Sequence, residues 1–509
     1  MTFYCALSTL FIAYFFLVIR RRDNVHVPLN WPYVGMLPSL LPNVHRVHDW
    51  FTDILKGGSH SFLFMGPWFS GMATVLTCNP DDLHYVTKTR ASNFPKGSDF
   101  TERFDILGDG LIPTSGDLWR NQRKIAQKLV HSKEFRVSAV MVTREKVEKG
   151  LVPMLNDVAQ QGMVVDLQDV FRRCAFDSMC KLVFGVDPCC LSIEFPTVPF
   201  VQATNEADEA VILRYIMPKS WWKLQRWLNI GSEKKLAEAW ERVDHFIYHH
   251  ISSRKQELTK LTKEKAGDNT QTTSPDLLTS YINYQLHDND ADNLHKSDKF
   301  LRDTTLNLLV AGKDTTSVAL AWFFWLLSKY PRSETKILEE LRAISPQKNK
   351  DLVVFDPLEL DGLVYLHAAL CETLRLFPSV PGLPRSVAER DVLPSGIEVR
   401  PGMSIIFLNY ALGRMEDIWG KDALEFKPER WISDKGTLKL DYSKYLVFGA
   451  GQRICLGKDL AFIQMKGVAA TTLFNFHVHV VEGQHVCLKP SIVLPIRNGL
   501  MVRMIKRSV

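Results

Sequence analysis

The sequence predicts a mainly α-helical protein with small antiparallel β-sheets. Over most of the chain, apolar residues recur three and four positions apart, as in residues 144–160 and 334–345, which is the spacing of a helix with one buried face. Alternating runs bounded by turn residues occur at 395–408, 476–481 and 499–507, and they predict short strands. The predicted class is therefore mainly α with a minor β part. The polar stretch 259–276 is poor in large apolar residues and is expected to be a surface loop.

The composition indicates a protein with a large core and limits the kinds of partner that are expected. The chain has 509 residues, of which 46% are hydrophobic and 23% charged, enough to bury a large core. The net charge of +6 is small, and no basic run is interleaved with aromatic residues, so nucleic acid is not an expected partner. Nine cysteines are scattered without Cys-x-x-Cys spacing, which indicates neither a disulfide framework nor a zinc ribbon.

The N-terminus predicts a membrane anchor. The uncharged run 3–19 would span roughly 26 Å at about 1.5 Å per residue, close to the thickness of the endoplasmic reticulum bilayer. A cleaved signal peptide would carry its basic residues before the apolar run, whereas here three arginines follow it. We expect residues 1–22 to cross this membrane once, residues 23–45 to form a proline-rich spacer and the start of the globule, and residues 46–509 to form a cytosolic domain.

One cysteine stands in an unusual setting, the stretch "FGAGQRICLG" at 448–457. Glycines flank Cys455, and an apolar helix is predicted just after it, so backbone N–H groups would point at the sulfur and favour the metal-binding thiolate. A buried thiol, a disulfide partner and a nucleophile are the alternatives. A dinucleotide fingerprint is excluded, because the third glycine and a βαβ unit are missing.

Two pairs of polar residues lie at helical spacing. Glu372 and Arg375 are three apart and share a helix face, which by itself indicates only a surface ion pair. Trp119 and Arg123 are four apart and also share a face.

Another polar group interrupts an apolar helix at 308–327. Asp314 and Thr315 lie inside this segment, where polar groups need a partner. Locally, Thr315 could bond a nearby carbonyl and Asp314 could pair with a base.

These motifs occur together in one known family. "FGAGQRICLG" matches the Phe-x-x-Gly-x-Arg-x-Cys-x-Gly haem-binding signature at every fixed position, and nearly the whole chain resembles the cytochrome P450 superfamily. The resemblance implies the fold of that superfamily and haem b as cofactor, with Cys455 as the axial ligand of the iron. It also implies that Trp119, Arg123, Arg453 and Arg385 of "GLPRSV" bind the haem propionates.

The resemblance assigns the remaining polar residues too. It implies that Arg430 of "FKPERW" joins Glu372 and Arg375 in a buried network that braces the haem pocket, a structural role. It implies that Asp314 and Thr315 are catalytic and relay protons to the reacting dioxygen.

Within the superfamily, two long stretches, 410–431 and 150–170, resemble plant hydroxylases of fatty acids and alkanes, most of all the midchain alkane hydroxylase branch. We therefore expect a monooxygenase that inserts one oxygen atom from dioxygen into an aliphatic substrate. Some relatives in that branch perform oxidative phenol coupling, so this alternative stays open. A membrane haem-binding protein without turnover is the third alternative, and it would not require Asp314 and Thr315.

The chain contains no motif for a flavin or a nicotinamide, so its electrons are expected from a membrane-bound NADPH-dependent reductase. Lys124 and Lys128 are candidates for its docking face. Substrate contacts are expected from apolar loops at 100–114 and 380–386 and from the turn near Ile496.

Overall fold

The structure is a computed structural model and describes residues 27–58, 60–68, 70–264, 276–287, 297–345 and 352–507. Its helices are α2 (Leu37–Leu40), α3 (Val47–Lys56), α4 (Pro80–His84), α5 (Gly97–Arg103), α6 (Gly116–Val130), α7 (Lys133–Lys146), α8 (Val152–Gln161), α9 (Leu167–Phe184), α10 (Pro199–Ile216), α11 (Lys219–Leu228), α12 (Gly231–Glu264), α13 (Leu277–His287), α14 (Asp298–Lys329), α15 (Pro331–Ile344), α16 (Val364–Leu376), α17 (Asn409–Leu412), α18 (Glu416–Trp419) and α19 (Lys458–Asn475). The strands are β1 (Ser61–Met65), β2 (Ala73–Thr77), β3 (Val164–Asp166), β4 (Gly382–Ser386), β5 (Asp391–Val392), β6 (Glu398–Val399), β7 (Ser404–Leu408), β8 (Phe476–Val480) and β9 (Met501–Lys506). Short 3₁₀ or π turns are η1 (Leu41–Arg46), η2 (Tyr85–Thr89), η3 (Ala91–Asn93), η4 (Asp105–Leu107), η5 (Val147–Leu151), η6 (Pro428–Trp431) and η7 (Gly451–Arg453).

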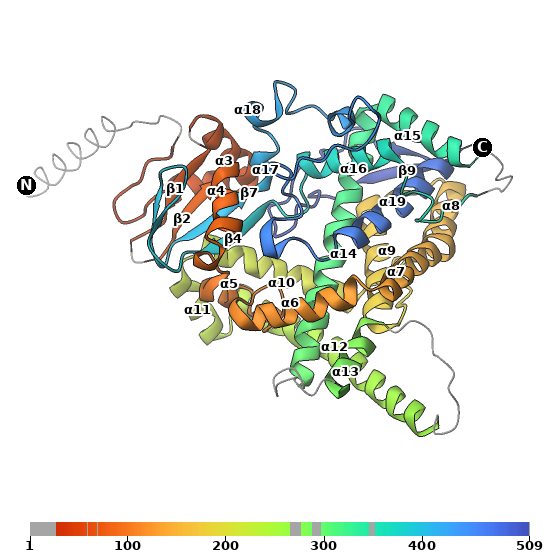
Figure 1. The fold of residues 1–509 in the computed structure, drawn as a ribbon, viewed down its shortest axis with the longest axis horizontal. Coiled ribbons are helices and arrows are strands. Elements are labelled where there is room, and N and C mark those ends of the chain that lie inside the picture. The colour runs from red at the N-terminus through yellow and green to blue at the C-terminus, as the bar shows by residue number, and fades with distance from the viewer. Residues whose placement is uncertain are drawn as a thin grey trace, which may run out of the picture.

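Helix α14 is the central element of the fold. It crosses the middle of the molecule, with the four-stranded sheet on one side and α15, α16 and α19 on the other (Figure 1). The helix begins where the Ser297 hydroxyl accepts a hydrogen bond from the Phe300 N–H over 3.1 Å, and it ends at Tyr330, before Pro331 opens α15. Most of its side chains are buried on all sides, as expected for a helix in the core of a large protein.

Three small sheets accompany the helices, which confirms the predicted minor β part, but the expectation that all pairs are antiparallel is wrong for β2 and β7. The largest has the strand order β1-β2-β7-β4, in which β2 and β7 are parallel and the other pairs antiparallel. The second has the order β3-β9-β8, and β5 pairs with β6. The predicted strands at 395–408, 476–481 and 499–507 are confirmed as β6 with β7, β8, and β9. Register in the first sheet places Arg385 of β4 opposite Ile405 of β7.

The main core lies where α14 meets α9, α16 and α19. Trp322 of α14 stacks on Phe377, with ring centroids 4.0 Å apart, and its indole N–H donates to the Leu494 carbonyl over 2.7 Å. A fully buried aromatic side chain contributes about 1.5–3 kcal/mol by leaving water, provided that its polar atom is paired. This core holds α14 rigidly beside the helices that carry the polar motifs.

Two expectations from the sequence concern segments that lie wholly or partly outside the described residues. The expected anchor, residues 1–22, lies outside the described residues. None of the described helices is long and apolar enough to cross a membrane. The polar stretch 259–276, expected to be a surface loop, is helical in its first part, because α12 continues to Glu264. Lysine, leucine and glutamate there are good helix formers, and the preceding Leu258 packs against the core.

Candidate functional site

The loop before α19 presents Cys455. The turn η7 precedes it, and the Cys455 N–H donates to the Phe448 carbonyl over 2.7 Å. Gly451 has φ +66°, and a Cβ there would lie 2.2 Å from the Thr87 carbonyl oxygen, so only glycine fits this close approach. The signature glycine thus seats the loop against η2 and determines the direction of the cysteine.

The Cys455 thiol is accessible and chemically poised. Among the described cysteines, all of which are free, only Cys455 and Cys189 are exposed. Desolvation by the surrounding protein raises the pKa of Cys455, while the Gly457 N–H and the charge of Arg123 act in the opposite direction and favour the thiolate. An accessible thiol in desolvated surroundings lies in a recess of the protein. This is the setting of a sulfur that meets a ligand or a metal, and neither a buried nor a disulfide-bonded cysteine fits it.

Helix α6 forms the next part of the recess. Arg123 donates from Nη2 to the Ile454 carbonyl over 2.6 Å, which ties α6 to the cysteine loop, while its Nε is buried without a hydrogen-bond partner. Trp119, one turn earlier, lies beneath the Arg453 guanidinium, whose carbon is 4.3 Å from the ring centroid. The structure therefore brings Trp119, Arg123, Arg453 and Cys455 together from segments more than 300 residues apart.

Four cationic side chains lie close together in this recess: Lys96, Arg123, Arg385 and Arg453. Desolvation, together with the charges of Arg385 and Arg123, lowers the pKa of Arg453 to about 9. Desolvation also lowers the pKa of Arg385 to about 10, and it lowers that of Lys96, to which Arg385 and Arg453 add. Among the residues that the structure describes, no carboxylate pairs with any of the four. Since desolvated charges are costly without a partner, the cluster favours an anionic ligand.

Lys96 is the member of the cluster that the sequence did not reveal. Its backbone N–H donates to the Ser115 hydroxyl over 2.9 Å, and its carbonyl accepts from the Ser386 hydroxyl over 2.8 Å. The ammonium lies 4.1 Å from the centroid of the Phe100 ring. No spacing in "FPKGSDF" indicates this position, because only tertiary contacts to β4 and to the start of α6 bring Lys96 to the site.

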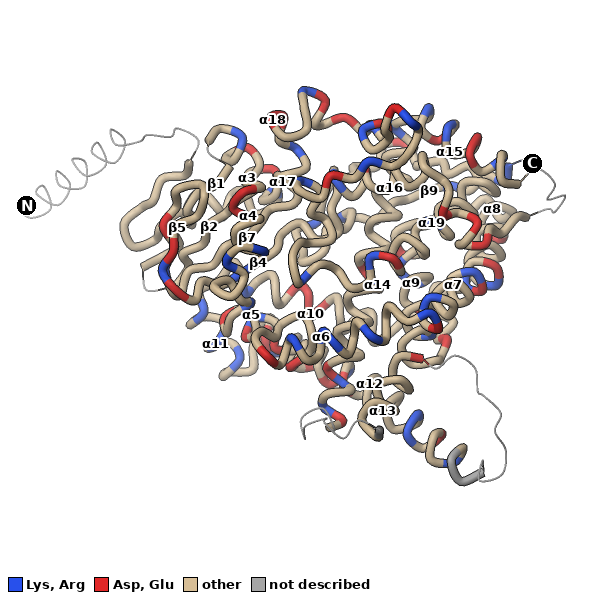
Figure 2. Tube along the Cα trace, viewed as in Figure 1, with Lys and Arg blue, Asp and Glu red and all other residues tan. Residues whose placement is uncertain are grey.

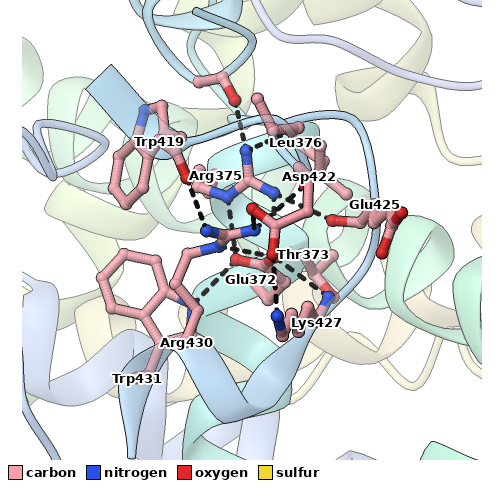
Figure 3. A network of polar contacts seen from close by, with 12 residues as sticks. Glu372, Thr373, Arg375, Leu376, Trp419, Asp422, Glu425, Lys427, Arg430 and Trp431 are labelled. Atoms are coloured by element: carbon pink, nitrogen blue, oxygen red, sulfur yellow. Dashed lines mark hydrogen bonds and ion pairs between the residues drawn. The ribbon is translucent and has the colours of Figure 1, made fainter. Parts of the chain in front are cut away.

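A buried network of polar groups joins α16 to the segment 413–431 (Figure 3). Glu372 is fully buried, and its two oxygens lie 2.8 Å from Nε and Nη2 of Arg375. Arg430 approaches Glu372 Oε1 to 3.3 Å, and the Trp431 indole N–H donates to Oε2 over 2.8 Å. The three residues expected to form a network therefore meet, and Trp431 is a fourth member that the sequence did not indicate.

The network also ties separate segments together through the backbone. Arg375 donates to the carbonyls of Ala423 and Glu425, over 2.7 and 3.0 Å. Arg430 donates to the Trp419 carbonyl over 2.8 Å and pairs with Asp422 at 2.9 Å. These bonds join α16 to the loop that leads from α18 through η6 toward the cysteine.

Asp314 and Thr315 lie near the middle of α14. The Thr315 hydroxyl donates to the Ala311 carbonyl one turn earlier, over 2.7 Å. Asp314 is buried, with Lys313 Nζ 2.6 Å from one carboxylate oxygen and Arg172 Nε 3.6 Å from the other. Both local expectations are therefore confirmed: the Thr315 hydroxyl bonds a nearby carbonyl, and Asp314 pairs with basic side chains. Lys313, fully buried, and Arg172 of α9 are partners that the sequence did not indicate.

Apolar side chains of residues 100–106 pack together next to Lys96. Phe100 and Phe104 stack with ring centroids 4.4 Å apart, and both join Ile106 in a core cluster with α10 and α14. On the outer face of α6, Lys124 and Lys128 are exposed, and Figure 2 shows basic residues along α6 and α11. Within the described residues, no group of three His, Cys, Asp or Glu side chains is placed to hold a metal ion.

Comparison with known proteins identifies the family. The sequence profile of cytochrome P450 matches residues 25–502. Cytochrome P450 86B1 of Arabidopsis thaliana is 42% identical over 96% of this chain and 88% of its own length, and alkane hydroxylase MAH1 of the same plant is 40% identical over 99% and 98%. Noroxomaritidine synthase of Narcissus aff. pseudonarcissus MK-2014 is 39% identical over 99% of this chain and 96% of its own.

Membership of this family implies the cofactor and the general type of reaction. Proteins of this family bind haem, iron protoporphyrin IX, and work with a redox partner, dioxygen and a hydrophobic substrate. The accessible thiol beside a cluster of unpaired cations agrees with such a cofactor. The chain belongs to the cytochrome P450 family and is a haem-dependent monooxygenase.

Proposed function

We propose that haem b binds in the recess between α6 and the cysteine loop, with Cys455 as the axial ligand. The observation that carries this proposal is the cluster of Lys96, Arg123, Arg385 and Arg453, four desolvated cations that pair with no carboxylate among the described residues, next to the exposed thiol. Propionates supply the missing anions, and Arg123 already has an unpartnered Nε for one of them. When bound, the haem supplies the iron at which dioxygen is activated and one oxygen atom is transferred.

The residues of the chain orient this group. Arg123, Arg385 and Arg453 neutralise the propionates, and Trp119 supports Arg453 from below. Glu372, Arg375 and Arg430 are structural: they hold α16 and η6 against each other and so brace the cysteine loop.

Asp314 and Thr315 move protons. Lys313 and Arg172 pair with the Asp314 carboxylate and hold it in place next to Thr315 in the sequence. The Thr315 hydroxyl, bonded to the Ala311 carbonyl, holds a proton on the exposed side of the helix turn. Proton delivery of this kind gives turnover, so the family membership and this pair together argue against a protein that only binds haem.

The substrate is proposed to be aliphatic, a long alkane attacked in midchain or a fatty acid. The wall of Phe100, Phe104 and Ile106 is apolar, and a relative of 40% identity is named an alkane hydroxylase. Oxidative phenol coupling or another specialised oxidation is the second candidate. It is favoured by the relative of 39% identity that is named noroxomaritidine synthase.

The protein is proposed to act at the endoplasmic reticulum membrane, with residues 1–22 as a single anchor, 23–45 as spacer and start of the globule, and 46–509 as the cytosolic haem domain. Helix α11 supports a membrane setting, because Trp221 and Trp227 are 50% and 80% exposed beside basic residues. An NADPH-dependent reductase is the proposed electron donor, docking near Lys124 and Lys128.

The test is mass spectrometry of products formed by the full chain with a plant NADPH-dependent reductase in membranes. The substrates are a long alkane, a fatty acid and a phenolic alkaloid precursor. An alcohol within the alkane, or a hydroxylated fatty acid, is expected. Unchanged aliphatic substrates beside a phenol-derived product two hydrogens lighter would reject the aliphatic proposal and support coupling.

A further inference from the structure

Ser379 lies where α14 meets the loops that are expected to contact the substrate. It stands between the end of α16 at Leu376 and the start of β4 at Gly382. Its side chain is buried, and its hydroxyl donates to the backbone carbonyl of Thr315 over 2.7 Å. The loop that enters β4 is therefore bonded directly to the turn of α14 that carries Thr315.

The bond from Ser379 leaves α14 intact. A carbonyl oxygen inside an α-helix accepts from the N–H four residues further on and keeps a second lone pair. Ser379 uses this second lone pair of the Thr315 carbonyl, and α14 runs through the position without interruption. The Thr315 hydroxyl has a different partner, the Ala311 carbonyl. The loop thus holds the backbone of Thr315 without competing for its hydroxyl.

The turn near Ile496 is joined to the same serine. The Leu494 N–H donates to the Ser379 carbonyl over 3.0 Å, and the Leu494 carbonyl accepts from the Trp322 indole N–H over 2.7 Å. Trp322 lies about two helical turns after Thr315 on α14. These bonds close a ring from Thr315 through Ser379, Leu494 and Trp322 back to α14. A shift of either loop is therefore transmitted to the turn that carries Thr315.

Both loops are fixed at their far ends as well. Gln168 of α9 is buried, and its side-chain amide accepts from the Ile496 N–H over 2.8 Å and donates to the Ile496 carbonyl over 3.1 Å. Such a two-point contact fixes both the position and the orientation of a backbone unit. On the other side, β4 pairs with β7 from Gly382 to Ser386. The Ser379 hydroxyl joins this firmly held frame to Thr315.

A second buried serine shows what an ordinary structural hydroxyl does. Ser178 of α9 donates to the Cys174 carbonyl over 2.7 Å, within its own helix. Ser379 makes a bond of the same length, but it connects two elements that are far apart in the chain, and its acceptor belongs to the residue that is proposed to hold a proton. The two serines therefore form a matched pair for comparison.

We propose that Ser379 is a positioning residue for the reaction, whose hydroxyl fixes the loops at 379–386 and 494–496 relative to Thr315. The inference rests on the proposed proton role of Thr315. With the bond in place, the loops that hold the substrate and the hydroxyl that delivers a proton keep one arrangement. Because displacements of about 1 Å can reduce the rate of an enzymatic reaction strongly, loss of the bond should alter both the site of attack and the use of dioxygen.

The central experiment compares Ser379→Ala with Ser178→Ala in the full chain, reconstituted in lipid vesicles with a plant NADPH-dependent reductase. Hexadecane, hexadecanoic acid and a phenolic alkaloid precursor are supplied separately. Product isomers, NADPH oxidation and hydrogen peroxide are measured for each substrate that the wild type oxidises. In Ser379→Ala we expect products at neighbouring positions and a fall in product per NADPH of roughly three- to tenfold, the effect of one lost hydrogen bond. Ser178→Ala should behave like the wild type.

Further variants separate positioning from packing and from proton delivery. Ser379→Thr retains a hydroxyl and should recover the product isomers and the coupling. Wild-type isomers and coupling in Ser379→Ala, or equal changes in Ser379→Ala and Ser178→Ala, would overturn the positioning role. If Thr315→Ala forms peroxide in that case, only the role of Ser379 fails, and if Thr315→Ala is fully coupled, the proposed proton role of Thr315 fails with it. An unchanged carbon monoxide difference spectrum in each variant establishes that the haem site is intact.

Discussion

Arg375 and Glu372 form a two-point ion pair in which Nε and Nη2 of the arginine each lie 2.8 Å from a different oxygen of the carboxylate. Both side chains are almost completely buried. The geometry is the parallel fork that makes arginine the preferred partner of a buried carboxylate. Removal of Glu372 leaves Arg375 without a carboxylate partner in the core, whereas removal of Arg375 leaves Glu372 with Arg430 at 3.3 Å.

Glu372→Ala should therefore destabilise the fold by about 3–5 kcal/mol, because it leaves Arg375 uncompensated and also removes a partner of Arg430 and Trp431. Thermal unfolding and the yield of haem-loaded protein measure the effect. The control is Glu425→Ala, because Glu425 contributes only its backbone carbonyl to Arg375. A Glu372→Ala protein as stable as the control would contradict the structural role.

Replacing the exposed thiol tests the proposed haem ligand. Cys455→Ala should lose the carbon monoxide difference spectrum that is characteristic of a thiolate ligand, since it removes the sulfur that would bind the iron. Cys189→Ala, at the other exposed cysteine among the described residues, should retain it. Retention of the thiolate spectrum in Cys455→Ala would reject the assignment.

The cation cluster predicts how firmly the cofactor is held. Arg453→Leu removes one charge-assisted partner of a propionate, and such bonds contribute about 1.5–3 kcal/mol, so haem loss should accelerate at least about tenfold. Transfer of haem to an apo-globin scavenger measures the rate. Arg400→Leu, at an exposed ion pair with Glu398, is the matched control. Equal rates in the two variants would show that Arg453 does not bind the haem.

The hydroxyl of Thr315 can be tested against a second hydroxyl on the same helix. Thr315→Ala should keep haem and substrate binding but divert reduced oxygen to hydrogen peroxide, with product per NADPH falling several-fold. The Ser317 hydroxyl donates to the Lys313 carbonyl in the same way that Thr315 donates to that of Ala311, so Ser317→Ala removes an equivalent bond in the core. The role of Thr315 in proton delivery would be untenable if both variants were fully coupled.

Acid should weaken the packing around the cysteine loop through His367. This ring stacks on Phe462 of α19 with centroids 4.2 Å apart. Burial, together with the charges of Lys466 and Lys458, lowers the pKa of His367 to about 4. The unfolded chain, with a pKa near 6.5, binds the proton more readily, so stability falls as the pH drops from about 6.5 toward 4. Midpoints of thermal unfolding against pH should fall less steeply in His367→Phe. His249→Phe, at an exposed position, should follow the wild type.

Much of the fold could be predicted because it depends on local chemistry. The 3.6-residue periodicity predicted the helices, and alternation predicted β6 to β9. The prediction was wrong at 259–264, where a polar composition hid a helix that gains its stability from packing of the preceding turn against the core. Polarity alone does not separate an exposed helix from a loop.

The functional site, too, could be predicted from the sequence only in part. The sequence alone determined the motif around Cys455, the helix after it, and the pairs Glu372 with Arg375 and Trp119 with Arg123, because these depend on residues within a few positions of one another. Only the tertiary structure decided which distant groups meet them: Lys96 at the cation cluster, Trp431 in the buried network and Arg172 at Asp314. Such partners come from packing between elements that are far apart in the chain, and no local spacing records that packing.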